Sequence, residues 1–177
     1  CLDASAGNYV DQTGQFSQIP CPAGTFQELT GQSSCDVATP GHYVDLSLGT
    51  GQIVQTPCPL GTYNSNTGST SSSSCNLAYA GYYVDQVGQT SATPCAIGTY
   101  QPATGKSSCY TADPGYYVDY IAQSAQIPCP AGKYNPLAGS TTSNDCLQAD
   151  AGYYVNIAMG FGQITQTACP VGTFNPN

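Results

Sequence analysis

Ten cysteines are the residues of this chain whose type and spacing could do chemistry. Their separations alternate between 20 or 23 residues and 14 or 17 residues, and the sequence contains a single histidine, His42. Zinc sites usually include ligand pairs two to four residues apart, so this spacing argues against a metal. We therefore expect disulfide bonds, with no metal and no cofactor.

The cysteines mark five tandem repeats, and each repeat has two halves. An opening cysteine precedes a phrase of the type Gly-Tyr-Tyr-Val-Asp, and a middle cysteine begins a phrase of the type Cys-Pro-x-Gly-Thr-Tyr. A recurrence with a period in the 30s is typical of array architectures. The repeats span residues 1–34, 35–74, 75–108, 109–145 and 146–177, of which the fifth is incomplete.

Each half of a repeat is predicted to form a short β-hairpin. Aromatic and β-branched residues, as in 115–119, favour a strand of about five residues. A second extended stretch runs into the middle cysteine, as in 15–20, 52–57 and 163–168, and should pair with the first. The half after the middle cysteine again has the pattern of strand, turn and strand.

The fold class that we expect is a small, all-β, disulfide-rich tandem repeat. Its hairpins would form an elongated rod or solenoid-like array with little or no helix, because no segment has helical periodicity. Repeat lengths vary in steps of three residues at 46–50, 69–73, 140–144 and 157–161. We place these segments in surface loops, which tolerate insertions better than paired strands do.

Charge and composition exclude several classes of partner. Two lysines against ten acidic residues give a formal charge of -8. Such a surface does not neutralise phosphates, which excludes nucleic acid and argues against anionic membranes. No apolar run reaches the ~20 residues of a membrane-spanning helix, so we expect no membrane insertion. Small cysteine-rich units persist in oxidising compartments, so we expect a secreted or cell-surface protein, of which this sequence is a window.

The cysteines allow two disulfide schemes. In the first, each middle cysteine bonds the next opening cysteine, which leaves Cys1 and Cys169 for partners outside this window or in another copy. In the second, opening and middle cysteines bond within a repeat, and no cysteine is left over. Its bonds would join Cys1 to Cys21, Cys35 to Cys58, Cys75 to Cys95, Cys109 to Cys129 and Cys146 to Cys169. On the residues alone both schemes stay open.

The middle phrase carries a resemblance to known families. The phrase is Cys-Pro-x-Gly-Thr followed by Tyr or Phe; a glycine comes later, and another cysteine lies 14 residues after the first. This pattern resembles the repeats of ephrin receptors and the first half-module of tumour-necrosis-factor receptors. The additional cysteines of those modules are absent, and the Tyr-Tyr-Val half matches less well. Similar repeats occur in surface and flagellar-hair proteins of microbes and algae. The resemblance implies the first scheme, with the bonds Cys21–Cys35, Cys58–Cys75, Cys95–Cys109 and Cys129–Cys146.

The recurring tyrosines are the candidate assembly residues. Neighbouring side chains in a strand face opposite ways, so Tyr82 and Tyr83 cannot share a face. We expect one tyrosine of each pair to belong to an exposed aromatic ladder that packs laterally against a neighbour. The candidates are Tyr9, Tyr43, Tyr82, Tyr83, Tyr116, Tyr117, Tyr153 and Tyr154.

The remaining motifs predict no catalytic residue. The segment 104–107 lacks the upstream glycine of a phosphate loop, and no nucleophile elbow occurs. Carboxylates that follow the first phrase are interpreted as turn caps rather than ion ligands. These are Asp11, Asp45, Asp85 and Asp119, with Asn156 in the fifth repeat. The serine-rich segment 67–74 is a candidate for O-linked glycans.

Repetition without catalytic motifs favours a structural role. We expect an extracellular repeat protein that is not an enzyme and serves as a protomer or segment of a filament, stalk or surface appendage. Self-association would use the tyrosine ladder and open strand edges. The alternative is a receptor-type or adhesive module that binds a protein or a glycan, the latter through its aromatic side chains.

Overall fold

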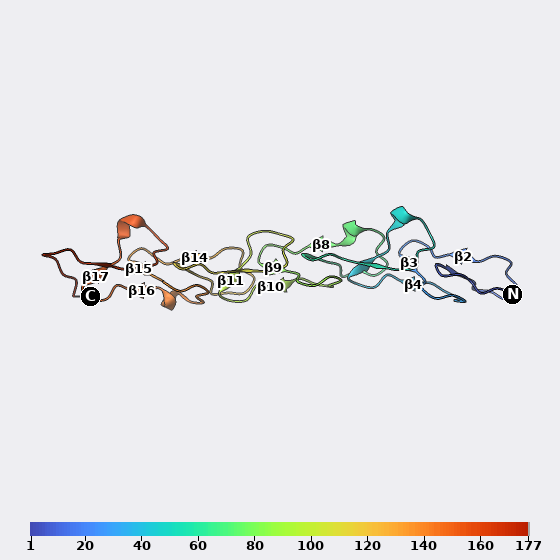
Figure 1. The fold of residues 1–177 in the computed structure, drawn as a ribbon, viewed down its shortest axis with the longest axis horizontal. Coiled ribbons are helices and arrows are strands. Elements are labelled where there is room, and N and C mark those ends of the chain that lie inside the picture. Colours follow the sequence, from blue (N-terminus) through green and yellow to red (C-terminus); the bar gives the residue numbers. More distant parts are fainter. Residues whose placement is uncertain (177) are drawn as a thin grey trace. The chain divides into compact units, whose positions relative to one another are not determined.

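The computed structural model describes residues 1–176, in which two-residue strands pair as nine separate antiparallel hairpins (Figure 1). No α-helix occurs in these residues. The pairs are β1 (Asn8–Tyr9) with β2 (Ile19–Pro20), β3 (Thr25–Phe26) with β4 (Asp36–Val37), β5 (His42–Tyr43) with β6 (Thr56–Pro57), β7 (Thr62–Tyr63) with β8 (Asn76–Leu77), β9 (Tyr82–Tyr83) with β10 (Thr93–Pro94), β11 (Thr99–Tyr100) with β12 (Tyr110–Thr111), β13 (Tyr116–Tyr117) with β14 (Ile127–Pro128), β15 (Lys133–Tyr134) with β16 (Leu147–Gln148), and β17 (Tyr153–Tyr154) with β18 (Thr167–Ala168).

The predicted all-β, disulfide-rich tandem architecture is confirmed, and both halves of a repeat form hairpins. The strands are shorter than the sequence suggested. In the β5 hairpin, Gly41 precedes the strand with a φ of 84°, a left-handed conformation that glycine adopts readily. After the strand, the Val44 N–H leaves the ladder and donates to the Ser69 carbonyl at 2.9 Å. Strand β5 is therefore limited on both sides.

The chain divides into two compact units. Unit 1 contains Cys1–Ala78, Val84–Ala92 and Gly105–Ser107. Unit 2 contains Tyr79–Tyr83, Thr93–Thr104 and the residues from Ser108 onward. Both units contain hairpins of the same kind, and within each unit the same type of hydrogen bond joins one hairpin to the next.

In unit 1, consecutive hairpins are joined by a repeating pair of backbone hydrogen bonds. The Gly7 N–H donates to the Gln27 carbonyl at 2.7 Å, and the Val10 N–H donates to the Gln32 carbonyl at 3.1 Å. The first bond starts before a strand and the second after it. Equivalent donors and acceptors are Gln27 to Gln52, Gly41 to Asn64, Val44 to Ser69, Gly61 to Val84, Asn64 to Gln89 and Val84 to Lys106.

Unit 2 repeats this bonding with the same backbone groups. The Gly98 N–H donates to the Val118 carbonyl at 2.8 Å, and the Gln101 N–H donates to the Gln123 carbonyl at 3.0 Å. Equivalent donors and acceptors are Gly81 to Gln101, Gly115 to Asn135, Val118 to Ser140, Asn135 to Gln163 and Gly152 to Asn175. One kind of contact therefore serves hairpins with different side chains.

A third bond reaches past the nearest hairpin to the one beyond it. The Gly51 N–H, in the β5–β6 loop, donates to the Cys21 carbonyl at 3.1 Å, and the Gly51 carbonyl lies against Gly7. In unit 2 the loop position is held once by an alanine: Ala122, with a φ of 59°, donates its N–H to the Cys95 carbonyl at 2.8 Å. Three successive hairpins are thus linked through their backbones.

The buried residues of each unit include two series that alternate from one hairpin to the next. After the second strand of successive hairpins, cysteine and alanine alternate, and after the first strand, valine and an amide alternate. The first series contains Ala4, Cys21, Ala38, Cys58 and Ala78 in unit 1, and Cys95, Ala112 and Cys129 in unit 2. The second contains Gln27, Val44, Asn64 and Val84 in unit 1, and Gln101, Val118, Asn135 and Val155 in unit 2. Such narrow cores bury few large side chains, so bonds between hairpins matter more.

The four segments that vary in length overlap short 3₁₀ turns. The turns are η1 (Leu46–Leu48), η2 (Ser72–Ser74), η3 (Ser143–Asp145) and η4 (Ile157–Met159). Their side chains are not buried, which fits the loops predicted from the sequence. The prediction is wrong for Ser69 and Ser140, which we also placed in surface loops and which are 8% and 7% exposed. Both hydroxyls are drawn inward because a buried asparagine donates to them.

Candidate functional site

Four disulfide bonds hold alternate hairpins closed. They join Cys21 to Cys35, Cys58 to Cys75, Cys95 to Cys109 and Cys129 to Cys146, with Cα–Cα distances of 5.6 to 5.8 Å. These are the bonds of the first scheme, and none joins an opening cysteine to the middle cysteine of its own repeat. Cys1, which is exposed, and Cys169, which is half-buried, are free thiols. Four such bonds indicate an oxidising environment.

The disulfide and disulfide-free hairpins place cysteine and alanine in the same position. The Cys58 N–H donates to the Gly41 carbonyl at 2.8 Å, and the Ala38 N–H donates to the Gly24 carbonyl at 2.9 Å. Cys58 and Ala38 are both completely buried. The backbone hydrogen bond therefore holds this position in both kinds of hairpin, and the disulfide is a further link present only where the residue is cysteine.

The alternating position after the first strand holds a buried amide in every disulfide hairpin. Asn135 Nδ2 donates to the Tyr116 carbonyl at 3.1 Å and to Ser140 Oγ at 2.8 Å, and its Oδ1 accepts from the Leu137 N–H at 3.0 Å. Asn64 makes the corresponding bonds to the His42 carbonyl, Ser69 Oγ and the Asn66 N–H. Each of these asparagine side chains therefore connects its own loop to the preceding hairpin through hydrogen bonds.

The length of the amide matches the length of the loop. Gln27 and Gln101 lie in the hairpins whose cysteines are 14 residues apart, and Asn64 and Asn135 lie in those whose cysteines are 17 apart. In the shorter loops the longer side chain reaches a backbone carbonyl, as Gln101 Nε2 does at Ser108 (2.7 Å). Our sequence analysis missed these residues. The signal that could have found them is the joint change of Asn or Gln with the cysteine spacing.

Replacing a buried amide should destabilise its hairpin. We expect Asn135→Ala to cost about 2 to 3 kcal/mol, because it removes three hydrogen bonds at a site with no access to water. Asn144→Ala is the control: Asn144 is exposed in η3, and the change should cost less than about 0.5 kcal/mol. Urea unfolding followed by tyrosine circular dichroism measures both. Equal midpoints for the two variants would show that the amide network is dispensable.

No family model and no curated protein matches this chain. The chain is a series of small disulfide-bonded β-hairpin units. Within residues 1–176 no helix is long and apolar enough to cross a membrane. The same residues contain no group of three or more His, Cys, Asp or Glu side chains placed to hold a metal ion.

The candidate tyrosines lie on the first strand of the disulfide-free hairpins. Six of them, in β1, β5, β9 and β13, are half-buried, whereas Tyr153 and Tyr154 in β17 are 41% and 38% exposed. Tyr116 is covered partly by the loop of the second hairpin ahead, since a Cβ built on Gly162 would lie 3.2 Å from its ring. The ladder is therefore less exposed than we expected, and its role in assembly stays a prediction.

A second set of aromatic residues occurs in the disulfide hairpins. Tyr100 in β11 lies directly opposite Tyr110 in β12, with ring centroids 5.9 Å apart and ring planes at 45°. Burial raises the pKa of the Tyr100 hydroxyl, and the Asp113 carboxylate raises it further. This pair packs within its own hairpin, so it is a local contact rather than a free aromatic surface.

The carboxylates predicted to cap turns do so where the loop is long. Asp45 accepts a hydrogen bond from the Ser47 N–H at 2.9 Å at the start of η1, and Asn156 accepts one from the Ala158 N–H at 3.0 Å at the start of η4. Hydrogen bonds from the Ser47 hydroxyl and N–H lower the pKa of Asp45. Asp11 instead accepts from Gln15 Nε2 at 3.0 Å. An amide replaces a carboxylate at Asn156, which fits a cap better than an ion ligand.

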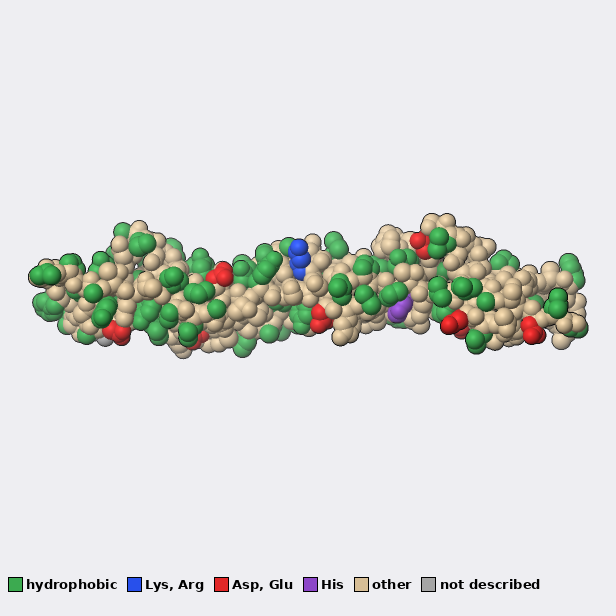
Figure 2. Space-filling view, viewed as in Figure 1, with side chains coloured by type: hydrophobic (Ala, Val, Ile, Leu, Met, Phe, Trp, Pro, Cys, Tyr) green, Lys and Arg blue, Asp and Glu red, His purple; other side chains and the backbone are tan. Residues whose placement is uncertain are grey.

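Exposed apolar side chains are scattered over the face shown in Figure 2. Several lie on the long loops, where Leu48 and Met159 are 71% and 69% exposed.

The single histidine, His42, is half-buried. Its Nδ1 lies 3.2 Å from Thr39 Oγ1 and 3.3 Å from the Pro40 carbonyl.

The serine-rich segment 67–74 is a candidate for O-linked glycans, but Ser69 within it is buried. The exposed hydroxyls available for glycans therefore belong to other residues of the segment.

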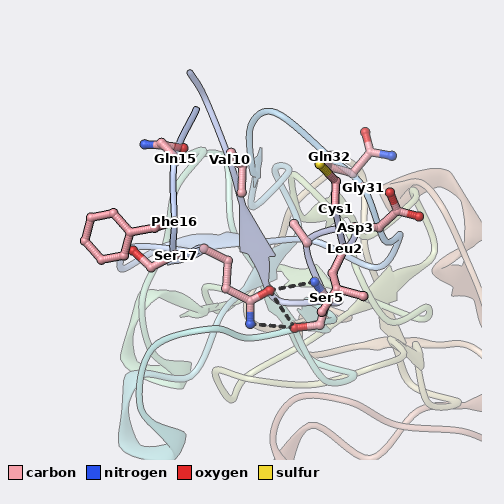
Figure 3. Close-up of a pocket in the computed structure, with 12 residues that line it drawn as sticks. Cys1, Leu2, Asp3, Ser5, Val10, Gln15, Phe16, Ser17, Gly31 and Gln32 are labelled. Atoms are coloured by element: carbon pink, nitrogen blue, oxygen red, sulfur yellow. Dashed lines mark hydrogen bonds between the residues drawn. The ribbon is translucent and has the colours of Figure 1, made fainter. Parts of the chain in front are cut away.

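One hollow of the described surface lies beside the first hairpin. Its volume is about 870 Å³, and it is lined by the segment Cys1–Ser5 and by residues of the β1–β2 loop, including Gln15 and Phe16. Gln18 is hydrogen-bonded to Ser5 at its edge, and Phe16 is directed away from Cys1 and fully exposed (Figure 3). A smaller hollow of about 380 Å³ in unit 2 is lined by residues that include Lys133, Tyr154 and Asn175.

Proposed function

We propose that this chain is a structural segment of an extracellular repeat protein, which contributes length to a filament, stalk or surface appendage. The observation that carries the proposal is the uniform bonding between hairpins. A glycine N–H before the strand or the N–H after it, and in most hairpins both, joins a hairpin to the next within each unit, as at Gly7, Val10, Gly98 and Gln101. Such an interface depends on the backbone, so further repeats can be added without a new contact.

Two further features support this role. Four disulfide bonds favour secretion or display at the cell surface, where thiols stay oxidised. The resemblance of the Cys-Pro-x-Gly-Thr-Tyr phrase to extracellular receptor repeats, and to repeats of microbial and algal surface appendages, fits the same location. The proposal assigns no catalysis to the chain, and its partner is a further copy of itself.

Electron microscopy of the oxidised chain tests the proposal. We expect filaments or fibres with a regular repeat, and we expect reduction of the disulfides to disperse them. A receptor-type or adhesive module would instead give dispersed particles that bind a defined protein or glycan in a binding screen. That result would overturn the structural proposal in favour of the alternative.

A further inference from the structure

One disulfide hairpin carries two tyrosines on opposite strands. Tyr100 in β11 lies directly opposite Tyr110 in β12, and their ring centroids are 5.9 Å apart with ring planes at 45°. This distance falls within the range of about 4.5 to 7 Å that is typical of packed aromatic pairs. Because side chains directly opposite one another in an antiparallel pair share a face, the backbone pairing holds the two phenol rings together.

The other three disulfide hairpins share the register but not this pair of rings. Each has an aromatic residue on its first strand, and the residue opposite is not aromatic. The pairs are Phe26 with Asp36, Tyr63 with Asn76 and Tyr134 with Leu147. The hairpin therefore forms without a second ring, and its fold does not explain the tyrosine at position 110.

The tyrosine pair is accessible to a small oxidant in the surrounding solvent. The Tyr110 side chain is 55% exposed, whereas the Tyr100 side chain is half-buried. The disulfide Cys95–Cys109 closes the same hairpin, which indicates that the hairpin forms in an oxidising environment. Two oxidisable rings are thus held in contact where oxidation takes place.

We propose that Tyr100 and Tyr110 are a site of oxidative modification, at which a carbon–carbon bond between the two rings forms a dityrosine cross-link. The pairing of β11 with β12 supplies the proximity that the coupling needs. Thiols do not cleave a carbon–carbon bond, so the hairpin would stay closed when Cys95–Cys109 is reduced. The inference goes beyond the proposed function, because it concerns a bond within one hairpin and not the assembly of copies.

The reaction balances with hydrogen peroxide as the oxidant and a haem peroxidase as the catalyst. Each phenol loses one electron and one proton, and the two tyrosyl radicals join through the ring carbons next to those that bear the oxygen. The hydrogen on each joined carbon then moves to the oxygen, which restores both phenols. The peroxide takes up the two electrons and two protons and becomes two molecules of water. The disulfide bonds take no part.

Trypsin digestion tests the cross-link directly, because Lys106 lies between the two tyrosines. The chain has two cleavage sites, after Lys106 and Lys133. The 177-residue chain is treated with peroxidase and hydrogen peroxide, and its monomer fraction is then reduced, alkylated and digested. We expect fragments 1–106 and 107–133 to stay joined with the loss of two hydrogen atoms, and mass spectrometry should locate the bond at Tyr100 and Tyr110. Fragments that separate would show a packing contact only and overturn the inference.

A matched pair of variants separates coupling of facing rings from oxidation of any exposed tyrosine. Tyr110 and Tyr120 are 55% and 68% exposed, and both lie in fragment 107–133. Replacement by phenylalanine keeps the ring and removes the phenol hydroxyl. We expect Tyr110→Phe to lower the yield of joined fragments by about tenfold or more, and Tyr120→Phe to leave it unchanged. Equal yields in the two variants would mean that coupling follows exposure, which would refute the assignment.

Hydrogen exchange measures whether the new bond holds the hairpin closed. The Ala112 N–H donates to the Gly98 carbonyl at 2.9 Å, beside the paired strands of this hairpin. After reduction of the disulfides, we expect the Ala112 amide to exchange about tenfold more slowly in the cross-linked chain than in the untreated chain. The Ala38 amide makes the same bond to Gly24 in a hairpin without a tyrosine pair, and it should exchange alike in both. Equal exchange at Ala112 in the two chains would exclude a role in holding the hairpin.

Discussion

Gly115→Ala is expected to unfold the hairpins around it, at a cost of more than about 4 kcal/mol. Gly115 is buried with a φ of 87°, and a Cβ at this position would lie 2.7 Å from the Gly162 carbonyl carbon and closer still to its oxygen. The obstacle is backbone, which cannot rotate away as a side chain can. Because the β13 hairpin and the Gly162 loop are two hairpins apart, one methyl group should disrupt three successive hairpins. Hydrogen exchange of the 115–162 amides measures this.

Gly152→Ala is the matched control for the same change. Gly152 has a φ of 82°, donates to the Asn175 carbonyl at 2.9 Å and accepts from the Cys169 N–H at 2.9 Å, which repeats the bonds of Gly115. Nothing lies within 4 Å of a Cβ built on it. We expect only the cost of left-handed backbone, about 1 to 2 kcal/mol. A similar loss of protection in both variants would mean that the close approach between hairpins contributes nothing.

The sequence predicted the hairpins because their signals are local. Tyr-Tyr-Val favours extended backbone, and proline before Cys21 or Cys129 keeps the approach to the cysteine extended. Strand length was not predictable in this way. Strand length depends on whether the N–H after the strand stays in the ladder or donates to the next hairpin, as the N–H groups of Val44 and Gln101 do. This bond depends on the packing of one hairpin against the next and not on the local sequence.

Burial of polar residues was also beyond the local sequence. Asn64 and Ser69 look like loop residues, yet they are 0% and 8% exposed, because Asn64 Nδ2 donates to Ser69 Oγ and to the His42 carbonyl. Their burial depends on the stacking of one hairpin on the next. The information is present in the sequence only as a comparison between repeats, where Asn accompanies the longer loop and Gln the shorter one.

The alternation of cysteine and alanine separates two contributions to stability. At Ala38 and Cys58 the backbone hydrogen bond and the burial are alike, so the hairpin position does not require sulfur. The disulfide acts instead on the unfolded chain, by restricting a loop of 14 or 17 residues. Hairpins without a disulfide are then held by the bonded hairpins before and after them.

Removal of one disulfide should therefore destabilise the chain without changing its packing. We expect Cys58→Ala with Cys75→Ala to cost about 3 kcal/mol, the loop entropy for 17 residues, because alanine already fits the Cys58 position in other hairpins. Urea unfolding without reductant measures the loss. Cys1→Ala with Cys169→Ala is the control, since both thiols are free, and the monomer should unfold at the parent midpoint. If the Cys58 variant also keeps that midpoint, the stability of the hairpins comes from their backbone bonds alone.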